Sequence, residues 1–401
     1  MSAYRQKSVD FVVFGLFLAL TLYNGIRLYN SFPDTYVWSE LMLNYQGGLV
    51  KRALLGEIAF QLDRGGVPAS VFLTGVVVLL WIAVIWCLVF VFRLQDRFAG
   101  LLLLVSPAGA MFPFLDFDAF GRKDVIVILA VVLSLMALER VRDARRCLAL
   151  VYAIFLVAGP FTEVVFFYFP FVFWTFLLMR RELGGRFRFG AAVVSAVFVL
   201  GCLLANYHFS SADEQAIAVS WRAAYPSVYV ADDGALCCLT WDFAHVARYV
   251  ITSMGGHLPR DTYLPGFILA LLPIAFLLPV KEARPRTLLE RLAMIGALVA
   301  AIGPMVLAID WGRFISMLTM FLFLCLWVVK FGTAAAGIAS WRPPAGPDAR
   351  LTSRPRAAML LLLVFALSWR MLHYAAPGYS GVVSGPLISW AWSPEVFKYR
   401  P

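Results

Sequence analysis

The chain has 401 residues, of which 62% are hydrophobic and only 14% are charged. Soluble globular domains carry about 25% charged residues, so this composition excludes a soluble protein. The formal net charge of +10 would suggest a nucleic-acid partner for a soluble chain. Here, repeated apolar runs near the length that crosses a bilayer indicate a polytopic helical membrane protein. We therefore expect an all-α fold, a lipid bilayer around it and no nucleic-acid partner.

Apolar segments predict about eleven membrane-spanning helices in a single transmembrane domain over residues 1–401. The first apolar segment lacks a small-residue cleavage site, so we interpret it as an uncleaved helix. Several segments are shorter than a bilayer crossing, which indicates helices that extend into polar flanks or break inside the protein. The predicted spans are residues 11–29, 71–92, 101–114, 125–138, 148–158, 164–179, 191–207, 264–280, 292–309, 314–329 and 357–372.

Basic residues predict the orientation of these spans. Most of the 34 Lys and Arg residues lie near residues 5–7, 93–97, 140–146, 180–188, 281–291 and 330–356. Cytoplasmic loops are enriched in Lys and Arg, so the N-terminus is expected in the cytoplasm. The outer segments are then about 30–70, 115–124, 159–163, 208–263 and 310–313, with an outer tail at 373–401. Short amphipathic helices are expected in the outer loops, first in the stretch 49–60.

The turn at residues 115–124, LDFDAFGRKD, is the most densely charged outer segment. Ionisable groups are costly in hydrocarbon, so this turn must lie at a membrane face. Asp116 and Asp118 form a D-x-D pair that could chelate a divalent cation such as Mg²⁺ or Mn²⁺ together with a phosphate, or supply a base. Arg122 and Lys123 offer donors to phosphate oxygens, and Asp124 follows them. The alternative is a salt-bridge cluster that only fixes the turn.

The first outer loop carries further candidates for substrate binding. Asp34 and Glu40 follow directly on the first predicted helix. Lys51 and Arg52 open the amphipathic stretch, where they could bind an anionic substrate or anchor the chain to lipid headgroups. Both interpretations of these two cations remain open.

Two smaller outer turns repeat this pattern. The sequence GPFTE places Glu163 at the start of an aromatic helix, where it could also act as a helix cap. The sequence DWGRF places Asp310 and Arg313 about one helical turn apart, where they could pair with each other or hold an anionic substrate. The histidines have no partner at a recognisable metal or triad spacing. The pairing of Cys237 and Cys238 stays open.

Acidic residues after the first helix, an acidic motif between the third and fourth, and further charged outer turns form a layout that resembles the GT-C superfamily of polytopic membrane glycosyltransferases. The resemblance implies transfer of a sugar from a polyprenyl-phosphate or -diphosphate donor on the extracytoplasmic side. Asp34 then matches the first-loop acid, commonly the catalytic base or part of the donor and metal site. Asp116 and Asp118 match the second acidic motif. Asp34 has no acidic neighbour within two positions, so Glu40 and Asp116 are alternative bases.

The expected reaction inverts the configuration at the anomeric carbon, with a glycan, lipid or protein of the cell envelope as acceptor. Asp34 or Asp116 would deprotonate the acceptor hydroxyl, while Arg122, Lys123 and Arg313 offset charge on the leaving phosphate.

Two other classes of function remain open. A polysaccharide polymerase or ligase with a diphosphate-linked donor would depend more on the outer arginines than on the carboxylates. A lipid-linked oligosaccharide flippase or other transporter would need ionisable residues at mid-membrane depth, where these spans have few. The absence of an N-x-S/T site favours a bacterial inner (plasma) membrane.

Overall fold

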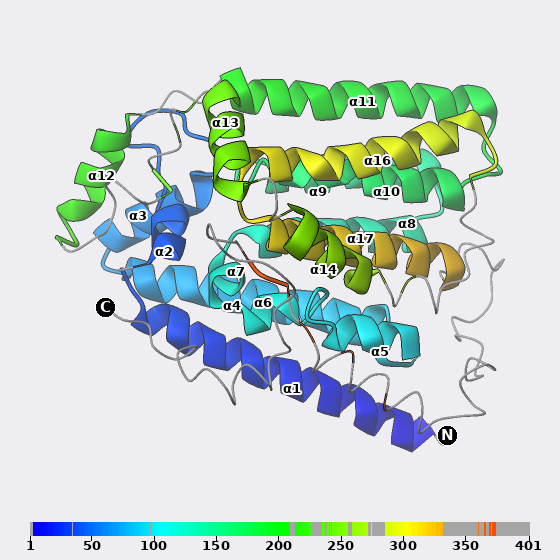
Figure 1. Ribbon diagram of the computed structural model, residues 1–401, viewed down its shortest axis with the longest axis horizontal. Coiled ribbons are helices and arrows are strands. Elements are labelled where there is room, and N and C mark those ends of the chain that lie inside the picture. Colours follow the sequence, from blue (N-terminus) through cyan, green and yellow to red (C-terminus); the bar gives the residue numbers. More distant parts are fainter. Residues whose placement is uncertain are drawn as a thin grey trace.

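The computed structural model describes residues 3–33, 35–96, 98–208, 213–226, 235–236, 239, 241, 243–255, 259–271, 274, 285–331, 360, 365, 369 and 371–373. In this part of the chain the fold is all-α, with sixteen α-helices. The long helices lie roughly side by side, while the short helices α2, α3, α7 and α12 gather at one end of them, on the left in Figure 1. The turns that connect the long helices therefore meet at two opposite ends of the protein.

Five helical segments are long and apolar enough to cross a membrane, by length and composition. They belong to α1 (Ala3–Asn30), α4 (Ala69–Trp86), α11 (Gly185–His208), α16 (Leu288–Leu307) and α17 (Trp311–Phe331). The π-helical turn η1 (Cys87–Val91) and the 3-10 turn η2 (Leu94–Asp96) extend α4. This is the finding expected of a multi-pass membrane protein.

The eleven predicted spans are not all seen as full-length helices. The segments predicted at 125–138, 148–158 and 164–179 form α8 (Asp124–Arg140), α9 (Ala144–Ala158) and α10 (Val165–Met179). These helices have 17, 15 and 15 residues. At 1.5 Å per residue each is shorter than the hydrocarbon core of about 30 Å. The segment at 264–280 begins as α14 (Leu264–Ala270), and most of the rest, like most of 357–372, lies outside the described residues.

The segment predicted as a span at 101–114 is broken, contrary to the single helix expected. It forms α5 (Phe98–Val105), α6 (Phe112–Leu115) and, after the predicted end, α7 (Phe117–Gly121). Pro107 follows shortly after α5, and proline cannot continue a helix because it lacks an N–H and restricts the residue before it. Pro113 then occupies the first turn of α6, a position that suits proline. The break brings the charged turn at 115–124 against the ends of other helices.

The aromatic helix α10 forms the centre of the bundle. It contacts α8, α16 and α17, and almost all of its side chains are buried. A helix that is apolar on every side is stable only when it is surrounded, so α10 lies inside the bundle. The outward faces are apolar as well, as expected for contact with lipid: α11 exposes Phe189, Val193, Val197, Leu200 and Leu204.

The short helices form over the end of the bundle where the acidic turns meet. These are α2 (Tyr36–Leu41), α3 (Leu54–Arg64), α12 (Glu214–Arg222) and α13 (Phe243–Met254). The predicted amphipathic stretch lies mostly in α3, which buries Leu55, Ala59 and Phe60. The Trp221 indole donates to the Met42 carbonyl at 2.5 Å and packs its ring edge-on against Phe60. These contacts hold the first loop in place.

The opposite end of the bundle is tied together by Glu290, whose side chain is fully buried. Arg188 donates to it at 2.7 Å and Arg181 at 3.0 Å. The backbone N–H of Arg286 donates to the same carboxylate at 2.7 Å. The carboxylate therefore joins the start of α16 to the segment between α10 and α11.

Replacing Glu290 by glutamine is expected to lower the free energy of unfolding by about 2 kcal/mol, because the buried Arg188 guanidinium loses its opposite charge while some hydrogen bonds remain. Thermal unfolding of the detergent-solubilised protein measures this. Arg291→Ala is the matched control, since Arg291 is the next residue of α16 and is exposed. Equal melting temperatures for the two variants would contradict the structural role of Glu290.

Candidate functional site

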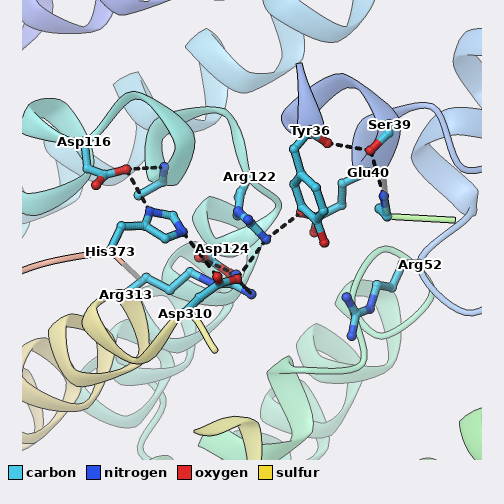
Figure 2. Close-up of polar contacts among 12 residues, drawn as sticks. Tyr36, Ser39, Glu40, Arg52, Asp116, Arg122, Asp124, Asp310, Arg313 and His373 are labelled. Atoms are coloured by element: carbon cyan, nitrogen blue, oxygen red, sulfur yellow. Dashed lines mark hydrogen bonds and ion pairs between the residues drawn. The ribbon is translucent and has the colours of Figure 1, made fainter. Parts of the chain in front are cut away.

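Charged turns that are far apart in the sequence converge at the end of the bundle that carries the short helices (Figure 2). Helix α2 supplies one carboxylate, the connection from α7 to α8 an arginine, and the start of α17 an aspartate and an arginine. The last described residues supply a histidine. We call this group the charge cluster; its members are Glu40, Asp116, Arg122, Asp124, Asp310, Arg313 and His373.

Asp310 is shared by the two arginines of the charge cluster. Arg122 Nη1 lies 3.1 Å from Asp310 Oδ2 and 3.3 Å from Glu40 Oε2. Arg313 Nη1 donates to both carboxylate oxygens of Asp124, at 2.8 and 2.9 Å, and its Nη2 lies 3.2 Å from Asp310 Oδ2. No side chain in this group is more than 12% exposed. The two arginines and three carboxylates form one continuous, buried ion network.

Tyr36 covers one side of this network. Its ring centroid lies 4.5 Å from the Arg122 guanidinium carbon, a cation–π arrangement that Figure 2 shows beside Glu40. The tyrosine is 38% exposed, so it forms part of the protein surface directly above a buried arginine.

His373 joins the charge cluster from the far end of the chain. Its Nδ1 lies 2.8 Å from Asp116 Oδ1, and its Nε2 lies 3.8 Å from Asp310 Oδ1. The backbone N–H of Gly312 donates to the His373 carbonyl at 3.1 Å. A Cβ at Gly312 would lie 1.6 Å from the Leu372 carbonyl oxygen, so only glycine permits this approach. Close backbone packing therefore fixes the histidine against Asp116.

Beside the charge cluster lies a second ion pair, between the half-buried Arg52 and the buried Glu163. Arg52 Nε donates to both Glu163 oxygens, at 2.7 and 2.8 Å. The Lys123 ammonium donates to the Arg52 carbonyl and is only 2% exposed. Arg52 has a φ of 64°, a left-handed conformation that is uncommon for a residue with a side chain. In this conformation the Arg52 carbonyl accepts from Lys123 while the Arg52 guanidinium donates to Glu163.

The arginines control the ionisation of the carboxylates around them. Burial acts to raise the pKa of Glu163 and Asp310, but the neighbouring guanidiniums outweigh it. The pKa of Glu163 falls to about 2, and the pKa of Asp310 falls well below its ordinary value. The pKa of Glu40 is lowered too, by Arg122 against the effect of burial. These carboxylates are therefore ionised and weakly basic.

Three further ionisable groups at this end of the bundle, Lys123, Asp118 and His373, also have shifted pKa values. Burial lowers the pKa of Lys123 to about 8, partly opposed by Glu40. Burial and the neighbouring Asp116 raise the pKa of Asp118. Burial acts to lower the pKa of His373, but Asp116 raises it, and the net shift is upward.

The predicted site residues fall into three groups. Six of them meet in the charge cluster: Glu40, Asp116, Arg122, Asp124, Asp310 and Arg313. Arg52, Lys123 and Glu163 form the adjacent group, in which Lys123 and Glu163 are buried and Arg52 is half-buried, as is Lys51 beside them. Asp118 lies in the first turn of α7. Asp34 lies outside the described residues, as do Cys237 and Cys238. Arg52 is not an exposed lipid anchor, because its guanidinium binds Glu163.

His373 is the member of the charge cluster to which no sequence pattern points. It lies 257 positions from Asp116, and no local spacing connects the two residues. The packing of Trp369 and Met371, both buried in the core around Ile315, brings this segment to the site together with the contact at Gly312.

The described residues contain no group of three or more His, Cys, Asp or Glu side chains that could hold a metal ion. The Oδ1 atom of Asp116 accepts from the Ala119 backbone N–H at 2.9 Å and also contacts His373. With Asp116 Oδ1 engaged in this way, and with no group of three such ligands among the described residues, the D-x-D pair does not fit a divalent cation.

An apolar pocket lies next to the Asp124–Arg313 ion pair. Its wall is formed by α4, α8 and α17 and by the broken segment, with Trp81, Pro113 and Met317 among the lining residues. The charged end of the site thus borders an apolar space between helices.

Protein-family models, curated proteins and solved structures were all compared with this chain, and none of them matches it.

Proposed function

We propose that this chain is a membrane glycosyltransferase of the GT-C type. It transfers a sugar from a polyprenyl-phosphate or -diphosphate donor to a glycan, lipid or protein acceptor of the cell envelope. The observation that carries this proposal is the convergence of separate charged turns into one buried cluster at the end of an apolar helical bundle. A substrate with a charged phosphate and an apolar tail suits a site where ions border lipid-facing helices.

The proposed orientation has the N-terminus in the cytoplasm and the charge cluster on the periplasmic or extracellular side of the inner membrane. The direction of α8 supports it, because this helix runs from Asp124 in the cluster to Arg140 at the other end. Arg180, which follows α10, lies at that other end too and donates to the Leu138 and Val141 carbonyls. Concentration of arginines opposite the cluster agrees with the positive-inside rule. In this proposal the shorter helices complete about eleven crossings.

The chemistry of the reaction requires donors for the leaving phosphate. Arg122 engages Glu40 and Asp310 through Nη1, while its buried Nε has no hydrogen-bond partner among the described residues. A guanidinium edge of this kind suits a phosphate oxygen. Positive charge held in place before the reaction lowers the barrier as negative charge builds on the leaving group. Arg122 is therefore the residue to which we assign the leaving phosphate.

The acceptor hydroxyl must lose its proton as its oxygen attacks the anomeric carbon from the face opposite the phosphate. A carboxylate in the site accepts this proton. Asp34, Asp116 and Asp118 are the residues proposed for this role.

A polysaccharide polymerase or ligase with a diphosphate-linked donor is a second candidate. It is favoured by the number of cations at this end of the bundle: Arg122, Lys123 and Arg313 are buried there, and Arg52 is half-buried. In that reaction the arginines would matter more than the carboxylates.

Transfer from a radiolabelled polyprenyl-phosphate sugar by protein in lipid nanodiscs tests the proposal. Arg122→Ala is expected to lower transfer at least about 100-fold, because a prepositioned cation on the leaving group is lost. Arg122→Lys should retain part of the activity, because it keeps the charge without the planar edge. Arg260→Ala is the matched control, since Arg260 is 76% exposed in its pair with Asp261.

Three outcomes discriminate between the candidate functions. Wild-type transfer rates in Asp34→Asn, Asp116→Asn and Arg122→Ala together would reject the assignment of this site. Activity that survives loss of the carboxylates but not of Arg122 would favour the polymerase or ligase. Movement of labelled donor across the bilayer without a new covalent product would favour a transporter.

A further inference from the structure

The carboxylates of the site differ in how far they are already engaged by other groups. Arg122 binds Glu40, Arg313 binds Asp124, and both arginines bind Asp310. The Arg52 side chain binds Glu163, as described above. A buried, ion-paired carboxylate loses the attraction of its cationic partner when it takes a proton, so it is a weak base.

Asp116 is engaged in a different way. Its Oδ1 caps α7 by accepting from the Ala119 N–H, and the same atom contacts His373 Nδ1. A side chain that both begins a helix and fixes a second residue is held in one orientation. Its position suits support of the turn better than proton transfer to and from a substrate.

Asp118 is the exception among these carboxylates. It forms no hydrogen bond or ion pair with any residue that the structure describes, and it is half-buried in the first turn of α7. The charges that act on it come from both sides of the cluster: Asp116, His373, Arg122 and Asp310. Asp118 thus lies beside the ion network without being neutralised by it, and it retains access to solvent.

We infer that Asp118 is the general base of the reaction and that Asp116, with His373, is a positioning residue for it. This inference rests on the proposed function. It separates the two acids of the D-x-D pair, one of which supports the turn while the other meets the acceptor.

The raised pKa of Asp118 agrees with this division, because a base is most effective when its pKa approaches the operating pH. In the step, the acceptor O–H bond breaks and its proton passes to the Asp118 carboxylate. The acceptor oxygen bonds to the anomeric carbon while the bond from that carbon to the phosphate oxygen breaks. The polyprenyl phosphate or diphosphate leaves with the electron pair, and Asp118 later returns its proton to water.

Transfer kinetics of Asp118→Asn test the inference, with a polyprenyl-phosphate sugar as donor in nanodiscs. We expect kcat to fall about 1000-fold with little change in the donor KM, because a general base contributes to the chemical step. Asp118→Glu should recover part of kcat. The wild-type rate should fall on the acidic side of its pH profile at a pH above the ordinary aspartate pKa of about 4, and this limb should be missing in Asp118→Asn.

Asp116→Asn and His373→Gln provide the comparison for a positioning role. Each should lower kcat less than Asp118→Asn does and keep the acidic limb of the profile, shifted in pH. Thermal unfolding of Asp118→Asn should match the wild type, because no described residue bonds to the carboxylate.

The two proposals fail in distinguishable ways. Absence of transfer by the wild-type protein from every lipid-linked donor would overturn the proposed function. A transferring wild type whose Asp118→Asn variant stays within threefold of its rate, or in which Asp34→Asn removes the acidic limb, would overturn the assignment of Asp118 alone.

Discussion

Replacing Asp310 by alanine is expected to lower the free energy of unfolding by about 4 kcal/mol and to abolish the proposed sugar transfer. The reason is that Asp310 lies between two buried guanidiniums, 3.1 Å from Arg122 and 3.2 Å from Arg313. Without it, two positive charges face each other with only Glu40 and Asp124 to offset them. Removing one partner from a buried ion network leaves an uncompensated charge, which is far more costly than losing a surface pair.

Thermal and denaturant unfolding of the solubilised protein measure this effect. Asp261→Ala is the matched control, because Asp261 also pairs with an arginine, Arg260, at 2.6 Å, but at the surface. The control should stay within about 0.5 kcal/mol of the wild type. Similar losses in both variants would show that the ion network around Asp310 is not the structural centre of this end of the bundle.

Replacing Lys123 by methionine is expected to stabilise the protein at neutral pH by up to about 3 kcal/mol while weakening the proposed sugar transfer. Burial lowers the pKa of Lys123 from 10.5 to about 8, so the folded protein holds this proton less tightly than the unfolded chain does. Keeping the ammonium charged in the fold therefore costs about 3 kcal/mol at any pH below about 8. Methionine fills similar space without that cost.

The pH dependence follows from the same shift. As pH rises from about 8 toward 10.5, the unfolded chain still binds the proton that the folded protein has released, so the stability of the wild type rises. The advantage of Lys123→Met should shrink over that range, measured as the difference in unfolding free energy between the two proteins at each pH.

Lys330→Met serves as the control, because Lys330 lies near the end of α17 and is only half-buried. A stabilisation by Lys123→Met that stays constant from pH 7 to about 10 would contradict the assignment of the effect to the buried ammonium.

Much of the fold could be read from local sequence, because hydrophobic runs and prolines act over a few residues. The apolar run at 71–92 predicts one helix, and α4 continued by η1 covers nearly all of it. Hydrophobicity does not reveal the break at 106–111, because 101–114 is as apolar as a continuous span. The proline at 107 and the turn from Ala110 N–H to the Leu103 carbonyl decide the geometry there.

The site could be predicted in part. Alternation of the predicted spans places Asp116, Arg122, Asp310 and Arg313 on one side of the membrane, because consecutive spans run in opposite directions. The structure brings these four residues together. Alternation could not find His373, whose place depends on Gly312 admitting the backbone of Leu372 and on the core that holds Trp369.

The sequence by itself determined that the protein is all-α and rich in membrane-length apolar helices, and that its acidic turns share one end. Those properties follow from hydrophobicity and helix direction, which are local or depend only on counting. Tertiary structure alone decided which carboxylate each arginine neutralises, and which acid has no such partner among the described residues. The physical reason is that ion pairing and burial change over a few ångströms. A single residue separates Asp116 from Asp118, yet Asp116 contacts His373 while Asp118 does not bond to any described side chain.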